Sequence, residues 1–127
     1  MSLAAGSPHL PIPAPIEAYG NGGFRFGGMS HRGSILCMPS GIWAWPVAGP
    51  DAINADTLSL VLGAGDALDF VLIGTGRELW RAPDALRARF AALKVSLDVM
   101  PTGAALRTYN VMFAERRRVA AALIAVE

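Results

Sequence analysis

The sequence predicts an α/β fold, a single three-layer domain with a mixed central β-sheet, an N-terminal antiparallel meander and flanking helices. Three observations lead to this prediction. The chain has 127 residues, the usual size of one domain, and its 53% hydrophobic and 17% charged residues are typical of a chain that buries a core. Short aromatic and β-branched runs broken by glycine fill the first part of the chain. Strand and helix patterns alternate after residue 68.

Residues 1–15 are expected to be a flexible proline-rich arm that precedes a single α/β domain over residues 16–127. Four prolines, at positions 8, 11, 13 and 15, remove backbone N–H donors from this segment. They also favour extended backbone without regular hydrogen bonds. We therefore expect no helix or strand to begin before residue 16.

The meander is predicted from short runs in which apolar residues alternate with polar ones. The predicted strands are residues 16–19, 24–26, 34–38 and 42–45. The sequence Asn21-Gly22-Gly23 between the first two runs is typical of a tight hairpin turn. We therefore expect neighbouring strands to pair antiparallel.

The rest of the chain is predicted to alternate helices and strands. The expected elements are a helix at 56–63, a strand at 69–73, a helix from 83 through 93, a strand at 95–99, a helix from 102 to about 114 and a last segment at 118–124. The last segment fits both a strand and a helix, and we favour a strand because an arginine turn leads into it. This order implies right-handed crossovers and a parallel pair inside a mixed sheet.

The ends of the predicted helices are set by particular residues. Asp56 is expected to cap the first helix and Gly63 to close it. Pro83 suits the first turn of the second helix, and Thr102 is expected to cap the third.

The basic residues are concentrated in one part of the chain, although the net charge is only +1. Residues 77–118 hold nine Lys+Arg and four Asp+Glu, whereas the first 76 residues hold two and five. Arg87 and Arg89, on the outward face of the second helix, either attract an acidic partner or only solvate that face. We expect a protein partner and no nucleic acid, and we leave self-association open.

We expect a cytoplasmic location without a membrane span. The first eight residues lack the basic start and apolar core of a secretory signal. The longest apolar stretch near the C-terminus, residues 119–126, is too short to cross a bilayer, which takes about 18–20 residues. The single cysteine, Cys37, forms no disulfide within the chain and fits a reducing compartment.

One candidate site follows the strand at 69–73. Gly74, Thr75 and Gly76 come directly after it, and the carboxyl ends of strands are where α/β sheets bind ligands. Successive backbone N–H groups in such a turn form an anion-binding nest. A plain tight turn explains the same residues, and the third glycine of a dinucleotide-binding motif is missing.

The helix from Thr102 adds polar residues to this site. Gly103, Arg107 and Asn110 share one narrow strip on a helix that is otherwise apolar and is expected to be nearly buried. If the strands that end at Ile73 and near residue 99 are neighbours, the turn after Ile73 lies beside the first turn of this helix. A small anion or polar ligand would then bind near Arg107, unless the strip is ordinary solvent-exposed surface.

The sequence holds no recognisable catalytic set, and we expect no metal and no cofactor. His9 lies in the arm and His31 in a predicted loop, without an Asp or Ser partner at a familiar spacing. Cys37 sits in an apolar run, where a buried, inert thiol is expected. Runs of three arginines such as Arg116-Arg117-Arg118 bind phosphate in some proteins, but in a turn they are more often solvated.

Three segments together resemble the domain of unknown function 498 family: residues 73–76, 100–110 and 117–124. The run Thr-Gly-Ala-Ala-Leu-Arg-Thr-Tyr-Asn within 100–110 is the most specific of them. This family includes a mitochondrial NADH dehydrogenase (complex I) assembly factor and an adipogenesis-associated domain protein. The resemblance implies a three-layer α/β fold with a mixed sheet and a non-catalytic role in assembling a respiratory complex. One departure is Ala114-Glu115-Arg116, where the family pattern has a Glu-Gly-Arg turn.

Two functional hypotheses follow. The first is a non-enzymatic binding or assembly protein whose partners include respiratory-complex subunits or other assembly factors, as the resemblance implies. The second is a small-molecule or anion-binding protein, with or without catalysis, whose tentative site is made of Gly74, Thr75, Gly76, Thr102, Arg107 and Asn110.

Overall fold

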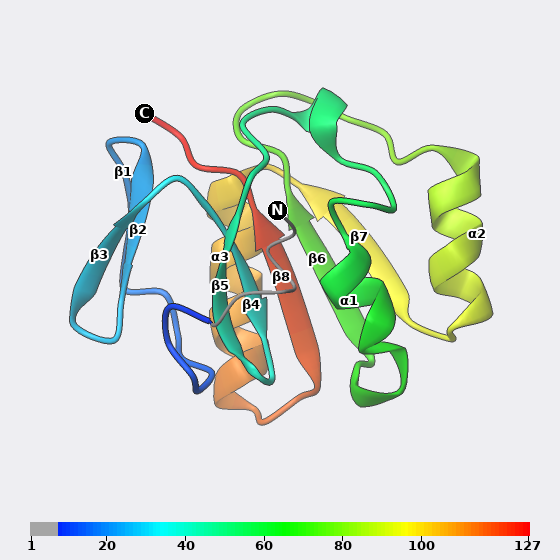
Figure 1. Ribbon diagram of the computed structural model, residues 1–127, viewed down its shortest axis with the longest axis horizontal. Helices are drawn as coiled ribbons and strands as arrows, with labels where there is room; N and C mark the ends of the chain where they lie inside the picture. The colour runs from blue at the N-terminus through cyan, green and yellow to red at the C-terminus, as the bar shows by residue number, and fades with distance from the viewer. Residues whose placement is uncertain (1–7) are drawn as a thin grey trace.

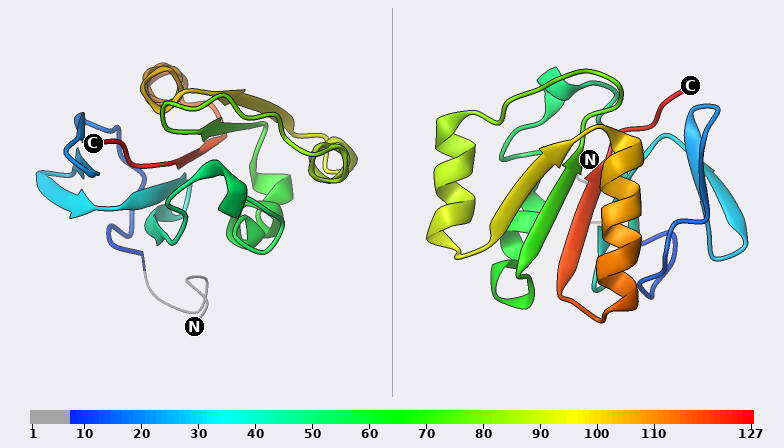
Figure 2. Two further views of the ribbon diagram at one scale, coloured as in Figure 1. Left: turned by 90° about the horizontal axis from the view of Figure 1, so that it is seen from above. Right: turned by 180° about the vertical axis from the view of Figure 1, so that it is seen from behind.

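The computed structural model describes residues 8–127, which form three layers around a mixed five-stranded sheet (Figure 1). Residues 1–7, which belong to the predicted arm and to the segment judged to lack a secretory signal, lie outside the described residues. Seen from above, helices lie on both sides of the sheet (Figure 2). The predicted α/β class with a mixed sheet is confirmed.

The five-stranded sheet has the strand order β5-β4-β8-β6-β7. Its strands are β4 (Ser34–Met38), β5 (Gly41–Trp45), β6 (Phe70–Gly74), β7 (Ser96–Met100) and β8 (Val119–Leu123). Strand β6 pairs parallel with both β7 and β8, whereas β4 pairs antiparallel with β5 and β8. The predicted parallel pair and the strand assignment for the last segment are therefore confirmed.

A second, three-stranded antiparallel sheet stands beside the first, as the left side of Figure 1 shows. It consists of β1 (Ala18–Gly20), β2 (Gly23–Phe26) and β3 (Met29–Arg32). The turns Asn21-Gly22 and Gly27-Gly28 have positive φ at both residues, the geometry of two-residue hairpins. The predicted meander is thus divided between two sheets, and β3 was missed because Met-Ser-His-Arg has no apolar alternation.

Three α-helices and two short 3₁₀ turns complete the described residues. They are η2 (Pro50–Ala52), α1 (Ser59–Gly63), η3 (Gly65–Ala67), α2 (Asp84–Ala92) and α3 (Thr102–Ala114). Two of the predicted caps are wrong. Helix α1 begins after Leu58 rather than at Asp56, because Asn54 and Thr57 form a reciprocal turn first. Thr102 is the first residue of α3 and its hydroxyl bonds elsewhere, while Pro101 stands at the N-cap.

Helices α2 and α3 end in the same way, with a left-handed residue after the cap. Lys94 follows α2 with φ 60° and Arg116 follows α3 with φ 61°. In each case the residue directly after the left-handed one closes the turn: the Val95 N–H donates to the Phe90 carbonyl at 3.1 Å, and the Arg117 N–H to the Met112 carbonyl at 3.0 Å. This is the hydrogen-bond pattern that usually has glycine at the left-handed position.

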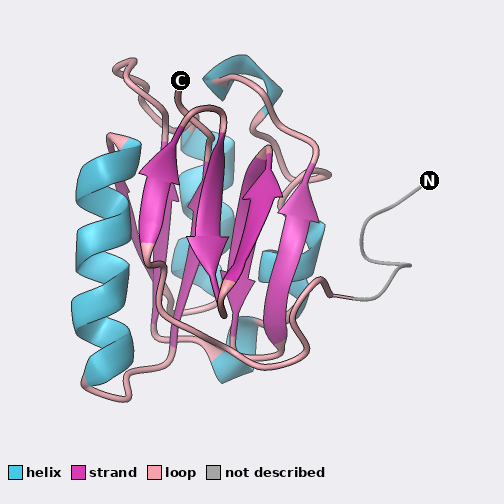
Figure 3. Cartoon of the chain, turned by 90° about the vertical axis from the view of Figure 1, so that its left-hand side faces the viewer, coloured by secondary structure: helices cyan, strands magenta, loops and turns pink. Residues whose placement is uncertain are grey.

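Two hydrophobic cores cover the two faces of the five-stranded sheet. The core on the α1 and α2 side contains Leu58, Val71, Phe90 and Ala122, and the core on the α3 side contains Phe26, Ile35, Leu72, Ala105 and Tyr109. Strands β6 and β8 in the middle of the sheet are buried on both faces. Figure 3 shows the helices beside the sheet. Helix α3 is not nearly buried, because only one of its faces meets the sheet and Val111 is 58% exposed.

The described part of the proline-rich arm lies against the domain. The His9 N–H donates to the Ile42 carbonyl at 2.8 Å, and the Ile42 N–H donates to the Leu10 carbonyl at 2.9 Å. Further along, the Tyr109 hydroxyl donates to the carbonyl of the buried Ala14 at 3.0 Å. Residues 8–15 contain no helix or strand, as expected, but these bonds hold them to the sheet.

Among residues 8–127, no helix is long and apolar enough to cross a membrane.

Candidate functional site

The carboxyl ends of β6 and β7 bring Thr75, Gly76 and Thr102 together, as expected from the parallel pairing of these strands. The Thr102 hydroxyl accepts a hydrogen bond from the Gly76 N–H at 2.8 Å and donates to the Ile124 carbonyl at 2.7 Å. The Thr75 hydroxyl donates to the Glu78 carbonyl at 2.7 Å. Both threonines are buried, and the Thr102 hydroxyl connects β6, β8 and α3. Thr75 also lines a small surface hollow of about 240 Å³ with Gly76 and Arg77.

Gly74 allows α3 to begin directly against β6. A Cβ at this position would stand 2.9 Å from the Cα of Thr102 and 3.0 Å from the Leu123 side chain. Such contacts are too short for a real side chain, so glycine is needed for this close approach. Gly74 therefore has a packing role at the strand end.

Gly76 and Arg107 line one surface hollow of about 400 Å³ at the start of α3. The hollow also includes Arg77, Gly103 and Tyr19. The Tyr19 hydroxyl lies directly over Gly103, where any Cβ would collide with it. Arg77 was missed by the sequence analysis because it follows the glycine turn without a motif, and Tyr19 because it comes from the separate small sheet.

Asn110 is used by the chain itself. Its side-chain amide accepts from the Ile16 N–H at 2.8 Å and donates to the Ile16 carbonyl at 2.9 Å. Asn110 is absent from the residues that line the hollow with Arg107. The structure thus places Gly76 and Arg107 at a hollow and gives Asn110 the task of holding the entry to β1.

Two histidines that looked unrelated in the sequence are neighbours. His31 lies in β3 rather than in a loop, and its ring centroid is 4.5 Å from that of His9. Burial lowers the pKa of His31, and the nearby His9 lowers it further, while a backbone contact at Ser34 opposes both effects. No sequence spacing signals this pair, because His9 is brought to β3 by its hydrogen bond to Ile42.

Cys37 and Tyr109 meet inside the core on the α3 side. Burial raises the pKa of the Cys37 thiol, and burial likewise raises the pKa of the Tyr109 phenol. A thiol that stays protonated in an apolar core is a poor nucleophile and a poor metal ligand. The described residues contain no group of three His, Cys, Asp or Glu side chains placed to hold a metal ion.

The chain is a small α/β domain in which a Gly-Thr-Gly turn and Thr102 at the start of α3 join β6, β8 and α3. The chain belongs to the family described as "Protein of unknown function (DUF498/DUF598)", whose model matches residues 16–124.

Similar proteins include one with a described role. An uncharacterized protein of Rhodobacter capsulatus is 33% identical over 122 residues, which cover 96% of this chain and 93% of that protein. The NADH dehydrogenase (ubiquinone) 1 alpha subcomplex assembly factor 3 of Xenopus tropicalis is 31% identical over 109 residues, 86% of this chain and 60% of the assembly factor. The chain therefore spans less than two thirds of that relative.

The fold also matches a solved structure. The crystal structure of an outer membrane protein from Bartonella henselae is 54% identical, with a TM-score of 0.89, and the match covers 94% of this chain and 100% of that chain. This match agrees with the single α/β architecture of the described residues.

Proposed function

We propose that this chain is a non-enzymatic binding protein that assists the assembly of a multisubunit complex, respiratory NADH dehydrogenase (complex I). The observation that carries the proposal is the 31% identity to an assembly factor of NADH dehydrogenase over 109 residues. The match covers only 60% of the assembly factor, so its identity alone does not give the partners of this chain. We propose that those partners are subunits of NADH dehydrogenase. The proposal further places the chain in the cytoplasm with protein partners rather than nucleic acid.

The chemistry of the strand-end residues supports a binding role. Thr75, Thr102 and Asn110 each bond to backbone groups of this chain, so their polar atoms stabilise the domain rather than act on a substrate. The thiol of Cys37 is fully buried and kept protonated. These side chains have the roles expected of a stable scaffold that presents its surface to a partner.

The test is a quantitative pull-down from the native cell. The affinity-tagged chain is cross-linked in vivo and the captured subunits of NADH dehydrogenase are measured by mass spectrometry against an untagged strain. We expect these subunits to be enriched, and deletion of the gene to lower the assembled complex on native gels. Normal levels of the complex together with no enrichment would exclude the assembly role. Size-exclusion chromatography with light scattering of the purified chain tests self-association.

The second candidate is a small-anion site at the hollow that contains Gly76. Two guanidinium groups, of Arg77 and Arg107, line it from different elements, and this observation favours an anionic ligand. Arg77 also donates to the Glu127 carbonyl at 2.8 Å, so part of its donor set is already used. Stabilisation by inorganic phosphate in a thermal shift assay, lost in Arg107→Ala, would favour this candidate over the first.

A further inference from the structure

A larger hollow, of about 670 Å³, lies at the opposite end of α3. Its apolar lining comes from distant parts of the chain: Pro13 of the arm, Pro39 of the β4–β5 turn, and Tyr109, Phe113 and Val119 near the end of α3 and the start of β8. Its volume falls within the range of about 300–1,000 Å³ that is usual for ligand sites.

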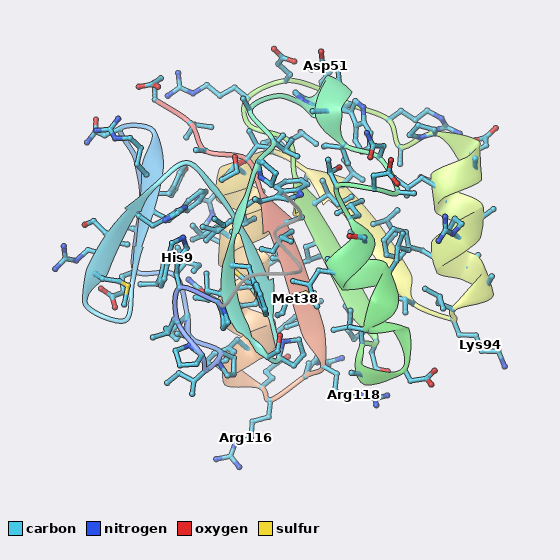
Figure 4. All side chains as sticks on the ribbon, in the orientation of Figure 1. His9, Met38, Asp51, Lys94, Arg116 and Arg118 are labelled. Atoms are coloured by element: carbon cyan, nitrogen blue, oxygen red, sulfur yellow. The ribbon has the colours of Figure 1, made fainter. Side chains whose placement is uncertain are left out.

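Three consecutive arginines, Arg116, Arg117 and Arg118, also line this hollow. All three are exposed, and Figure 4 shows Arg116 and Arg118 at the same end of the molecule. The three arginines are the charged residues among the described residues that line it, and Glu115 and Asp69 lie beside it as partners of Arg117 and Arg118. The sequence alone favours a solvated turn for these arginines, because Pro13 and Pro39, which help to form the hollow, lie far from them along the chain.

The three arginines differ in their partners within the chain. Arg116 forms no ion pair with the described residues, while Arg117 pairs with Glu115 at 3.0 Å and Arg118 with Asp69 at 2.7 Å. Both pairs are exposed, and exposed ion pairs contribute little to stability because water screens their charges. A carboxylate of a partner can therefore replace Glu115 at Arg117, whereas at Arg118 it competes with Asp69, which accepts two hydrogen bonds at 2.7 and 3.1 Å.

We propose that this arginine-lined hollow binds an acidic peptide segment of a partner protein. An aromatic or aliphatic side chain of the peptide packs on Phe113 and Val119, and its carboxylates bond the guanidinium groups of Arg116 and its two neighbours. The charges are complementary, because a hollow lined by three arginines, of which Arg116 has no ion pair among the described residues, and floored by apolar side chains favours an anionic and apolar ligand. The proposal rests on the proposed function only in taking the partner to be a protein.

A peptide fits this surface better than nucleic acid. The cationic lining is one compact cluster around an apolar floor, whereas nucleic-acid binding requires a basic surface along several phosphates. The net charge of the whole chain, +1, does not supply such a surface. The arginine fork also matches the planar geometry of a carboxylate in two parallel hydrogen bonds.

The experiment is an NMR titration of the ¹⁵N-labelled chain with the probe acetyl-Glu-Glu-Phe-Glu-Glu-amide. Acetyl-Gln-Gln-Phe-Gln-Gln-amide, of nearly the same shape without charge, is the control peptide. We expect saturable shifts at Phe113, Val119 and Ala67 with the acidic peptide, weakening as salt rises from 50 to 300 mM, and at least about fivefold weaker binding of the control peptide.

Matched variants separate this hollow from the other basic surface. Arg116→Glu/Arg117→Glu is expected to weaken peptide binding at least about fivefold, whereas Arg87→Glu/Arg89→Glu on α2 changes it less than about twofold. Arg116→Gly suits the left-handed backbone, so it keeps the fold and still lowers affinity. Lys94→Gly makes the same backbone change away from the hollow and leaves affinity unchanged.

The proposal is overturned if the acidic peptide causes no saturable shifts, if the Arg116 variants bind as well as the unchanged chain, or if the α2 reversal has the larger effect. Binding to phosphatidylglycerol vesicles, lost in the same variants without peptide binding, would assign the hollow to lipid and likewise overturn it. In the pull-down, Arg116→Glu/Arg117→Glu that still captures NADH dehydrogenase subunits refutes the binding role of the hollow and leaves the assembly role unaffected. If the acidic peptide binds but the unchanged chain captures no subunits, only the assembly role is refuted.

Discussion

At the scale of single residues, polar side chains in this domain join backbone segments that are far apart in the sequence. Thr102 bonds Gly76 and Ile124, and Asn110 bonds both backbone groups of Ile16, 94 positions earlier. A buried backbone group that loses its partner costs about 1–3 kcal/mol. Substitutions at these residues therefore act first on the stability of the domain.

Asn110→Leu is expected to lower the free energy of unfolding by about 2–3 kcal/mol, because the N–H and carbonyl of Ile16 both lose their partner. Urea denaturation followed by circular dichroism measures this change. Arg107→Ala, one turn earlier on the exposed strip of α3, is the matched control and should change stability by less than about 0.5 kcal/mol. An Asn110→Leu protein of unchanged stability that fails to bind its partner would instead make Asn110 a binding residue.

The histidine pair makes stability depend on pH. Because the pKa of His31 is lowered in the folded chain, the unfolded chain takes up a proton at higher pH. The contribution of neutral His31 to the free energy of unfolding is complete above the ordinary histidine pKa. It is lost as the pH falls through the lowered pKa of His31. We expect the urea midpoint to fall between pH 7.5 and 5, and His31→Gln to reduce this fall.

A second substitution separates the two causes of the lowered pKa. His9→Gln removes the neighbouring charge and leaves the burial of His31, so it should reduce the pH dependence less than His31→Gln. Equal pH dependence in the unchanged chain and in His31→Gln would show that other groups cause the loss of stability at low pH. In that case the pair of rings, 4.5 Å apart between centroids, does not make stability depend on pH.

At the scale of elements, the two longer helices stop at left-handed basic residues. Lys94 and Arg116 complete the C-terminal turns of α2 and α3, where a positive charge interacts favourably with the helix dipole. A left-handed conformation nevertheless costs a residue with a Cβ about 1 kcal/mol relative to glycine. Both positions therefore combine a favourable charge with an unfavourable backbone.

Lys94→Gly and Arg116→Gly are each expected to raise the free energy of unfolding by up to about 1 kcal/mol, since glycine removes the backbone cost and loses only a small dipole interaction. Thermal denaturation of both variants beside the unchanged chain measures this. Lys94→Ala and Arg116→Ala are the controls, because alanine loses the charge and keeps the Cβ, so neither should be stabilised. Glycine variants less stable than the alanine variants would show that the charges outweigh the backbone.

Much of the order of elements could be predicted from local patterns, and the failures have a common cause. Strands such as β4 and helices such as α3 are visible in the sequence because their apolar periodicity is strong. Strand β3 and the Thr102 hydroxyl were misjudged because their roles depend on partners elsewhere in the chain. At the candidate site, the proximity of Thr75 and Thr102 could be predicted from the parallel pairing of β6 and β7. The hydrogen bonds of Asn110 to Ile16 could not, because nothing in the sequence near either residue indicates them.

At the scale of the whole molecule, residues 8–16 cross one side of the domain and contact both sheets. Leu10 pairs with Ile42 at the outer edge of β5. Its side chain packs against Gly27 in the turn between β2 and β3, so closely that a Cβ on Gly27 would lie 3.1 Å from it. A free sheet edge exposes unpaired N–H and carbonyl groups that favour association between chains. The segment therefore covers an edge that would otherwise be open.

The last prediction concerns a chain from which residues 1–13 are deleted. It loses the bonds of His9 and Leu10 to Ile42, each worth about 1 kcal/mol, while the unfolded chain no longer has to order those residues. The free energy of unfolding should fall by only about 1–2 kcal/mol, but the opened edge of β5 should make the protein associate as its concentration rises. Urea denaturation and light scattering measure the two effects, with deletion of residues 2–7 as the control that keeps the contacts of His9 and Leu10. If the longer deletion matches this control in both measurements, residues 8–13 behave in solution as the flexible arm that their prolines predict.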